Sequence, residues 1–338
     1  MTLLYGKILE KANFKIDLLL LQIHKDVDNQ LKAFIPSHWN VDLIVNRFRY
    51  LIINIYQHIK RHHPDVAFCS TIGFSNLLLL LKFLHLFAGK VVVRDCNMPS
   101  KHTKLSILFS RCLFRYADIL IAQTDEMKAE MMEFYHLKER KIRVIHNPID
   151  KDLILKGIKE SVEILPKSTV LMACGRLQRQ KDIITLIKAF HLVRSQISNA
   201  ILYLIGREGD TEYMNEIHST IRSCEVEDSV LLVGFQENPY KYLKQADVFV
   251  LSSIYEGLPN VMLEAMYLGK PVAATRCIPY ISQVIVEGEN GYTCPVQDEK
   301  ALAECMIAAT KLKALPPYRD LNQSDDLVLN VFHEVLNS

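Results

Sequence analysis

Two glutamates separated by seven residues give the chain its clearest chemical pattern. The stretch EGLPNVMLE contains Glu256 and Glu264 and follows the apolar run ADVFVLSS. On one continuous helix the two carboxylates would lie about 12 Å apart along the axis and about 80° apart around it. That separation is too large for a general acid and base that work as a pair, so the pattern does not predict such a pair.

Pro259 restricts where a helix can begin in this stretch. Proline disfavours the helical conformation at Leu258, which predicts a helix start near Pro259 or Asn260, with Asn260 as the N-cap. Glu256 then lies in a loop above a strand end, and Glu264 lies in the first helical turn. Such a helix start suits an anion such as a phosphate, and the two carboxylates could hold its neutral neighbours by their hydroxyl groups. In the alternative, Glu264 only complements the helix dipole and Glu256 is solvated.

Two cations follow an earlier strand. The stretch CGRLQRQKD places Gly175, Arg176 and Lys181 between a strand and a helical pattern, at the edge where ligands bind in open α/β sheets. Two cations beside a helix N-terminus would suit a diphosphate, because each charge-assisted hydrogen bond contributes about 1.5–3 kcal/mol. The alternative is that both are ordinary surface residues of a loop. Gly206, in LIGREGD, gives a similar but weaker signal of a strand followed by a turn.

Short runs of β-branched residues or leucine alternate with longer amphipathic stretches along the whole chain. The first half contains KIDLLLLQ, VDLIV, PDVAFCS, KVVVRD, ADILIAQT and KIRVIHN, and the second half contains TVLMACG, AILYLIG, SVLLVGF, ADVFVLSS and KPVAAT. This alternation predicts an α/β fold with parallel sheets that carry helices on both faces. We expect two such domains, residues 1–150 and 151–318, and a C-terminal helix within 319–338 that packs back on the first domain.

The N-terminus departs from this rhythm. A doubly wound domain would open with a strand and a tight glycine turn, whereas MTLLYGKILEKANF has a helical pattern. The first strand of the N-terminal domain is therefore expected to be missing.

Composition excludes several classes of protein. With 338 residues, of which 49% are hydrophobic and 23% charged, the chain has the balance of a globular protein. Eight cysteines include no C-x-x-C pair, which argues against a zinc site or a disulfide framework and predicts reduced thiols in a cytoplasmic protein. No apolar stretch reaches the roughly 20 residues of a membrane span, and the N-terminus does not follow the order of a signal peptide.

Charge is distributed unevenly between the two halves. Residues 1–150 contain 21 Lys and Arg against 14 Asp and Glu, and the remaining residues contain 19 against 24. A basic first domain could contact an anionic membrane surface at its cytoplasmic face, although a solvated surface explains the same excess. The sequence lacks the basic patch with interleaved aromatic residues that is typical of nucleic-acid binding, so nucleic acid is not expected as a partner.

Taken in order, these motifs resemble the retaining glycosyltransferases of family 4, whose GT-B fold has two facing Rossmann-like domains. The marks are GRL with QK at 175–181, LIGREG, the spacing of the two glutamates, LGKPVAAT at 268–275 and ENG at 289–291, with a weaker likeness over 64–150. The resemblance implies that Arg176 and Lys181 bind the diphosphate of a nucleotide sugar and that Glu264 binds its ribose hydroxyl groups. Glu256 and the amides of 257–260 would hold the sugar and phosphate.

The resemblance thus implies two groups of site residues. The donor-binding group is Gly175, Arg176, Lys181, Gly206, Gly257, Leu258, Pro259, Asn260 and Glu264. Glu256, Arg176 and Lys181 are the implied catalytic residues. The loop RDCNMPS resembles the acceptor-side loop of the family, and the acceptor-side candidates in and near it are Arg94, Asn97 and His102.

The implied reaction is transfer of a hexose, with retention of configuration, from a nucleotide diphosphate sugar that is expected to be UDP-linked. The acceptor would be a lipid-linked sugar or a polysaccharide in cell-surface glycan synthesis, and neither a bound cofactor nor a catalytic metal is expected. Fixed cations and amides would stabilise the charge that the leaving diphosphate gains in the transition state. The match of DVD at 26–28 to a metal-binding D-x-D is interpreted as chance.

Three departures from the family pattern keep a second hypothesis open. One is the missing first strand. Another is that Tyr280 and Gln283 stand where part of the family has a glycine and a glutamate, and the third is that no glycine lies between Gly269 and Gly288. The chain could thus be a truncated or degenerate relative that binds nucleotide weakly or serves as a partner subunit. A nucleotide-sugar epimerase of the same build is a third hypothesis, which the ordered motifs favour less.

Overall fold

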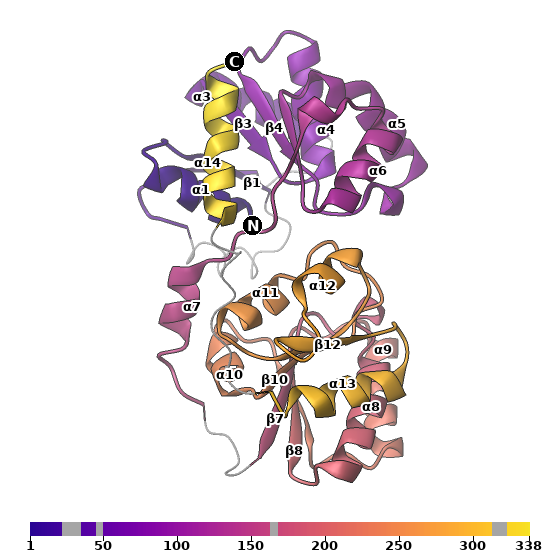
Figure 1. Cartoon of the computed structure of the whole chain (residues 1–338). Helices are drawn as coiled ribbons and strands as arrows, with labels where there is room; N and C mark the ends of the chain where they lie inside the picture. Colours follow the sequence, from indigo (N-terminus) through magenta and orange to yellow (C-terminus); the bar gives the residue numbers. More distant parts are fainter. Residues whose placement is uncertain (22–34, 45–49, 163–167, 313–322) are drawn as a thin grey trace. The chain divides into compact units, whose positions relative to one another are not determined.

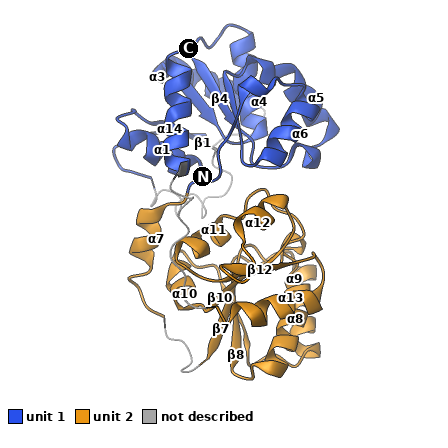
Figure 2. Cartoon of the chain, in the orientation of Figure 1, with its two compact units in different colours: residues 1–148, 322–338 blue, residues 149–321 orange. Residues whose placement is uncertain are grey.

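The chain folds into two compact units. The computed structural model describes residues 1–21, 35–44, 50–162, 168–312 and 323–338. Unit 1 comprises residues 1–148 and 322–338, and unit 2 comprises residues 149–321 (Figures 1 and 2). Both units consist of parallel strands with helices packed on them, which confirms the predicted α/β class. The D-x-D match at 26–28 lies outside the described residues.

Unit 1 contains two parallel sheets. The larger has the strand order β3-β4-β5-β6, and the smaller pairs β1 with β2. The strands are β1 (Asp17–Leu21), β2 (Asn40–Ile44), β3 (Val66–Cys69), β4 (Lys90–Arg94), β5 (Ile119–Ala122) and β6 (Ile142–Val144). All six coincide with the predicted runs, and helix α1 precedes β1 as the sequence pattern indicates.

Side chains of the larger unit 1 sheet alternate between two cores. On β5, Leu120 and Ala122 face one core, whereas Ile119 and Ile121 face the other, as expected of a strand that is buried on both sides. Helices α3, α4 and α6 contribute to the first core, and α1 and α14 contribute to the second. The helices are α1 (Thr2–Lys11), α3 (Leu51–His62), α4 (Ile72–Phe83), α5 (Lys104–Leu113), α6 (Asp125–Tyr135) and α14 (Gln323–Leu336).

The C-terminal helix α14 belongs to unit 1, although unit 2 precedes it in the sequence (Figure 2). Its Phe332 packs edge-on against Phe14 and Phe68, with ring centroids 6.4 and 5.9 Å apart. Glu334 on the same helix pairs with Arg143. Apolar burial therefore places the helix, and the partly exposed ion pair adds little.

Unit 2 has one six-stranded parallel sheet with the order β12-β11-β10-β7-β8-β9. Its strands are β7 (Thr169–Cys174), β8 (Ala200–Ile205), β9 (Val230–Gly234), β10 (Val248–Leu251), β11 (Val272–Thr275) and β12 (Gly291–Cys294). Five of these strands were predicted from the sequence. The sixth, β12, follows the turn at ENG and was not predicted, because GYTC is short and is not a run of apolar residues.

The same alternation builds the two cores of unit 2. Along β8, Leu202 and Leu204 join the core that contains α8, α9 and α13, while Ile201 and Tyr203 join the core on the opposite face. The helices are α7 (Lys151–Gly157), α8 (Ile183–Gln196), α9 (Thr211–Ser223), α10 (Tyr240–Gln245), α11 (Asn260–Tyr267), α12 (Pro279–Val284) and α13 (Glu299–Ala309). Across the described parts of both units, no helix combines the length and apolar composition that a membrane crossing requires.

Candidate functional site

The carboxyl ends of β7 and β10 lie side by side at one edge of the unit 2 sheet. From β7 the chain continues to β8 on one side, and from β10 it continues to β11 on the other. Such a reversal of strand order opens a crevice above the strand ends, where ligands bind in open α/β sheets. The two loops that follow these strands, residues 175–182 and 252–259, carry most of the predicted donor-binding residues.

Hydrogen bonds join these two loops. The Ser252 hydroxyl donates to the carbonyl oxygen of Lys181 at 2.7 Å, and the backbone N–H of Ile254 donates to that of Gln180 at 2.9 Å. The Gln180 side chain in turn donates to the carbonyl oxygen of Tyr255 at 2.8 Å. One backbone bond and two bonds from side chains to backbone carbonyls thus hold the loops together, which helps to position the side chains that project from them.

The main ionic contact of the site joins Lys181 and Glu256. Nζ of Lys181 lies 2.5 Å from Oε1 of Glu256, and the Ser253 hydroxyl donates to the same oxygen at 2.6 Å. The Lys181 side chain is 24% exposed and that of Glu256 only 9%, so the pair is largely shielded from water. A cation and a carboxylate therefore stand together where the sequence predicts the diphosphate and the sugar.

Two predicted glycines allow the backbone to come close at this edge. A Cβ added at Gly206 would lie 1.8 Å from the carbonyl oxygen of Gly175, so only glycine fits there. A Cβ added at Gly175 would lie 3.1 Å from Cε of Lys181, which is a tight contact. These glycines thus allow the ends of β7 and β8 to approach each other and leave room for the lysine.

Glu264 lies on α11 beyond its first turn, so the prediction that it lies in the first turn was wrong, because the helix already begins at Asn260. Its acidity is also altered. Burial of its carboxyl group raises its pKa to about 7; a hydrogen bond from Tyr240 opposes this, and repulsion by Asp150 adds to it. Near neutral pH the group is therefore divided between its charged and neutral forms. A carboxylate in this state can accept two hydroxyl groups when ionised, which is the role that the resemblance implies.

Helix α11 begins one residue earlier than the predicted N-cap requires. Asn260 is the first helical residue and Pro259 occupies the N-cap position, with no side-chain hydrogen bond that caps the helix. The prediction of Asn260 as N-cap was wrong, because the fixed φ of proline suits the turn into the helix as well as its first turn. Leu258 is 7% exposed and packs in the core, so within the loop its contribution to a ligand is its backbone.

Arg176 and Gly257 also lie on these two loops, and neither is fully buried. The Arg176 side chain is exposed, and among the described residues it has no ion-pair partner. Gly257 is half-buried, directly after Glu256. Arg176 is therefore available to an anionic ligand, whereas Lys181 is already paired.

The segment that departs from the family pattern forms α12. Helix α12 starts at Pro279, and Tyr280 is 3% exposed within the apolar core beside Ile281. The tyrosine ring thus fills core space where part of the family has a glycine. Burial explains how the substitution is tolerated and leaves Gln283 on a short, regular helix.

Among the acceptor-side candidates, Arg94 lies at the end of β4 and is 2% exposed. Its guanidinium donates to the Asn147 side chain and, at 3.1 Å, to Sγ of Cys96, and it lies over the Tyr5 ring. These contacts occupy Arg94 inside unit 1.

His102 belongs to a buried polar network around Asp95. Nε2 of His102 lies 3.1 Å from both carboxylate oxygens of Asp95, and the Tyr135 hydroxyl donates to the same carboxylate at 3.0 Å. The backbone N–H of Asn97 donates to Asp95 at 3.2 Å. The hydrogen bond to Asp95 raises the pKa of His102, against the opposing effect of burial.

Several partners of the predicted residues were not foreseen. Ser253, Tyr240, Asp150 and Asp95 each contact or act on a predicted residue, yet no spacing marks them. Asp95 had a weak signal, because it is the last residue of the predicted run KVVVRD and directly follows β4.

The two units and their parallel sheets define the chain as a GT-B protein. It superposes on HepE of Anabaena, whose structure was solved in complex with UDP, with a TM-score of 0.74 and 17% identity over 94% of this chain and 92% of HepE. The model of glycosyl transferases group 1 matches residues 156–323, and that of glycosyltransferase family 4 matches residues 9–153. The chain belongs to the family 4 glycosyltransferases.

Two relatives show how far the similarity extends. An uncharacterized glycosyltransferase of Methanocaldococcus jannaschii is 34% identical over 259 residues, which cover 72% of this chain and 62% of the relative, less than two thirds of its length. The UDP-Gal:alpha-D-GlcNAc-diphosphoundecaprenol alpha-1,3-galactosyltransferase of Escherichia coli is 29% identical over 328 residues, or 90% of this chain and 78% of the relative.

Proposed function

We propose that the chain transfers a hexose, with retention of configuration, from a UDP-linked sugar to a lipid-linked or polysaccharide acceptor, without a catalytic metal. The observation that carries this proposal is the grouping of Lys181, Glu256 and Ser253 at the carboxyl ends of β7 and β10. Exposed Arg176 lies on the same loop as Lys181. Two cations there would stabilise the charge that develops on the leaving diphosphate, and Glu256 would hold the sugar.

The uridine nucleotide is supported by the known proteins. HepE was crystallised with UDP, and the Escherichia coli relative uses UDP-Gal. In our proposal the Glu264 carboxylate accepts the ribose hydroxyl groups, and its pKa of about 7 makes this contact depend on pH near neutrality.

A lipid-linked acceptor is supported by a surface of unit 1. Helix α5 exposes Leu105, Leu108 and Phe109, which are 64, 56 and 55% accessible. The exposed cations that accompany them on or next to this helix are Lys101, Lys104, Arg111 and Arg115. Apolar side chains flanked by cations suit the boundary of an anionic membrane, where an acceptor such as the diphosphoundecaprenol-linked sugar of the Escherichia coli relative resides.

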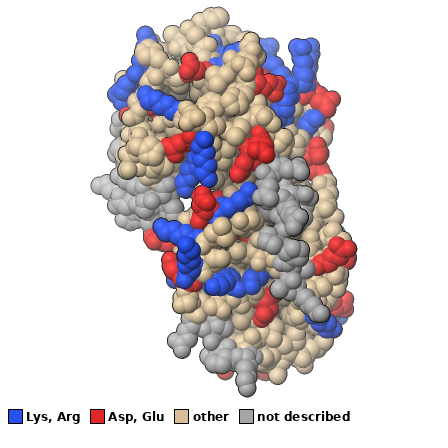
Figure 3. All heavy atoms as spheres, turned by 60° about the vertical axis from the view of Figure 1, so that its left-hand side comes forward, with Lys and Arg blue, Asp and Glu red and all other residues tan. Residues whose placement is uncertain are grey.

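Charged side chains on the face in Figure 3 are mixed in sign. On the face in Figure 3, acidic and basic side chains are interspersed and do not form one continuous basic patch. The proposed membrane contact is therefore argued from α5 and its flanking residues, and not from the face that Figure 3 shows.

Calorimetric titration with UDP and with GDP, in buffer without metal, tests the donor site. We expect UDP to bind the wild-type chain, binding to be lost in Lys181→Ala and Arg176→Ala, and binding to persist in Lys188→Ala, which removes an exposed lysine of α8. If neither nucleotide binds, the chain is the degenerate relative. If UDP binds but no sugar is transferred to lipid-linked acceptors, the donor site is correct and the acceptor or the activity is not.

A further inference from the structure

Two histidines on one face of α3 meet a carboxylate of the small sheet. His58 and His62 are four residues apart, so both project from the same side of the helix, and their ring centroids lie 4.5 Å apart. Asp42 on β2 lies opposite them. Side-chain exposures of 11% for His58, 13% for His62 and 27% for Asp42 place the cluster mostly inside unit 1.

Two ring nitrogens approach the same carboxylate oxygen. Nδ1 of His58 lies 2.8 Å, and Nε2 of His62 lies 3.2 Å, from the same oxygen, Oδ2 of Asp42. All three atoms lie within 4.8 Å of one another. Ligand atoms of a tetrahedral zinc ion lie about 2.0–2.2 Å from the metal and about 3.3–3.6 Å from one another. Small shifts of the three side chains would bring their ligand atoms to this spacing around an ion.

A second carboxylate lies beside His62. Oδ1 of Asp17 on β1 lies 3.2 Å from Nδ1 of His62, and the Asn40 side chain donates to that same oxygen at 2.6 Å. Both ring nitrogens of His62 thus face carboxylate oxygens, Nδ1 that of Asp17 and Nε2 that of Asp42. A carboxylate behind a histidine is also the usual support of a metal-ligating ring.

Arg61 is the competing partner of Asp42. Its Nη1 donates to both carboxylate oxygens, at 2.9 and 2.8 Å, and its side chain is 63% exposed. Arg61 can keep Oδ1 while Oδ2 binds an ion.

We propose that His58, His62 and Asp42 bind a divalent transition-metal ion of the zinc class, with Asp17 orienting His62. Two imidazole nitrogens and one carboxylate oxygen suit zinc, and water would complete the coordination. The ion would connect α3 to the β1–β2 sheet. Since a two-stranded sheet is marginally stable by itself, this connection would stabilise it. All of these residues lie in unit 1, so the site is independent of the metal-free donor site proposed for unit 2.

Titration of the full chain with Zn²⁺ alone tests this site. After treatment with a chelator, the wild-type chain should bind one Zn²⁺ in competition with a chromogenic chelator. His58→Gln and His62→Gln should each weaken binding by at least about tenfold, and Asp17→Asn should weaken it by about 10–100-fold. Equal zinc affinity in the wild type and both histidine variants, or no binding at all, would overturn the proposal.

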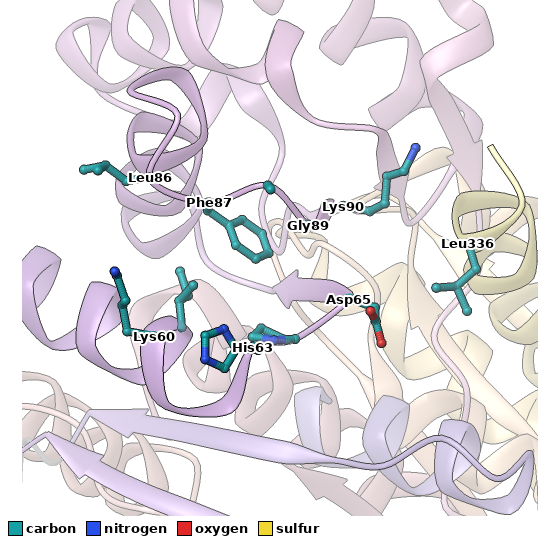
Figure 4. A pocket seen from close by; sticks show the side chains of 11 residues that line it. Lys60, His63, Asp65, Leu86, Phe87, Gly89, Lys90 and Leu336 are labelled. Atoms are coloured by element: carbon teal, nitrogen blue, oxygen red, sulfur yellow. The ribbon is translucent and has the colours of Figure 1, made fainter.

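The adjacent His63 provides a matched control. His63 is exposed and lines a different hollow, at the amino ends of β3 and β4, with Lys60, Asp65 and Lys90 (Figure 4). His63→Asn, which tolerates the left-handed backbone at this position, should leave Zn²⁺ affinity unchanged. Circular dichroism checks that each variant folds. A Co²⁺ spectrum without thiolate charge transfer distinguishes this site from the eight free cysteines, and thiolate absorption would count against it.

Discussion

Lys181 and Glu256 form a shielded ion pair, with Nζ of the lysine 2.5 Å from Oε1 of the glutamate, although 75 positions separate them in the chain. The lysine that we propose for the diphosphate is therefore already neutralised before any donor binds. An incoming diphosphate must compete with Glu256 for this cation. Once displaced from Lys181, the carboxylate is free to accept sugar hydroxyl groups, so donor binding and sugar contact are coupled through one exchange of partners.

This coupling predicts that Glu256→Gln has opposite effects on the affinity for UDP and on the rate of sugar transfer. Without its counter-charge Lys181 should bind UDP as tightly as in the wild type, or several-fold more tightly. Sugar transfer should fall by about tenfold or more, since a hydrogen-bonding carboxylate is lost. Calorimetry and a transfer assay measure the two effects, with Lys181→Ala as the comparison. Weakening of UDP binding equal to that of Lys181→Ala would show that Glu256 does not compete for the lysine.

The raised pKa of Glu264 predicts a pH dependence of UDP affinity. When the pH falls below this pKa of about 7, the carboxyl group of Glu264 is protonated and loses acceptor capacity. UDP should therefore bind more weakly at pH 6 than at pH 8. In Glu264→Gln the side chain no longer titrates, and only the protonation of UDP itself should remain. Calorimetric titrations of both proteins across this range measure the difference. Parallel pH profiles would remove Glu264 from ribose binding.

Gly206 and Gly234 should respond differently to a methyl group. In Gly206→Ala the new Cβ would lie 1.8 Å from the carbonyl oxygen of Gly175, so the backbone at the strand ends must move. Gly234 has a φ of +75° and no atom within 4 Å of an added Cβ, so Gly234→Ala should cost only about 1–2 kcal/mol of backbone strain.

Calorimetric unfolding and UDP titration separate the two glycine variants. Gly206→Ala should lower UDP affinity by tenfold or more and should destabilise unit 2 by more than Gly234→Ala, by about 2 kcal/mol or above. Gly234→Ala should keep wild-type UDP affinity. Equal affinities in the two variants would mean that the close approach of Gly175 and Gly206 does not shape the binding site.

Most of the fold could be predicted because local patterns specify it. The run AILYLI forms β8 with every residue buried, and its alternation between two cores follows from strand geometry alone. The turn into α11 was predicted from Pro259 to within one residue. In contrast, β12 has no run of apolar residues to mark it, and only pairing with β11 makes GYTC a strand.

The candidate site could be predicted as a set of residues but not as a set of contacts. Arg176, Lys181 and Glu256 were placed on the correct loops because each loop follows a strand end, and Glu264 was placed on the correct helix but one turn too early. Their partners depend on strand order, which brings β7 next to β10 although β8 and β9 intervene in sequence. No spacing within either loop shows that Lys181 and Glu256 would pair.

The exposed face of α5 predicts binding to anionic vesicles. Replacing Leu105, Leu108 and Phe109 together by serine removes three largely exposed apolar side chains, so the fold should be retained while vesicle binding falls by tenfold or more. Co-sedimentation with vesicles that contain anionic lipid measures this. A matched triple variant at three of the other exposed apolar residues, Phe83, Leu84 and Leu86, controls for general loss of hydrophobic surface. Equal loss in both variants would show no specific role for α5.

The pair of His102 and Asp95 predicts that the stability of unit 1 depends on pH. Because the hydrogen bond to Asp95 raises the pKa of His102 in the folded chain, the protonated histidine stabilises unit 1. This contribution is fully present below the unfolded pKa of about 6.5 and is lost as pH rises through the folded pKa. A hydrogen bond between charged groups contributes about 1.5–3 kcal/mol, and His102→Gln should forfeit that amount at low pH and much less at high pH.

Fluorescence of Trp39 can report the stability of unit 1, since this only tryptophan of the chain is buried in that unit. Urea unfolding followed by its fluorescence at pH 6 and pH 8.5 should give a wild-type advantage over His102→Gln that shrinks at the higher pH. His85→Asn, which replaces an exposed histidine with a left-handed backbone, should give a difference that does not change with pH. If the advantage over His102→Gln is constant or grows with pH, the contact stabilises unit 1 through the neutral imidazole, and Asp95 does not favour the charged ring.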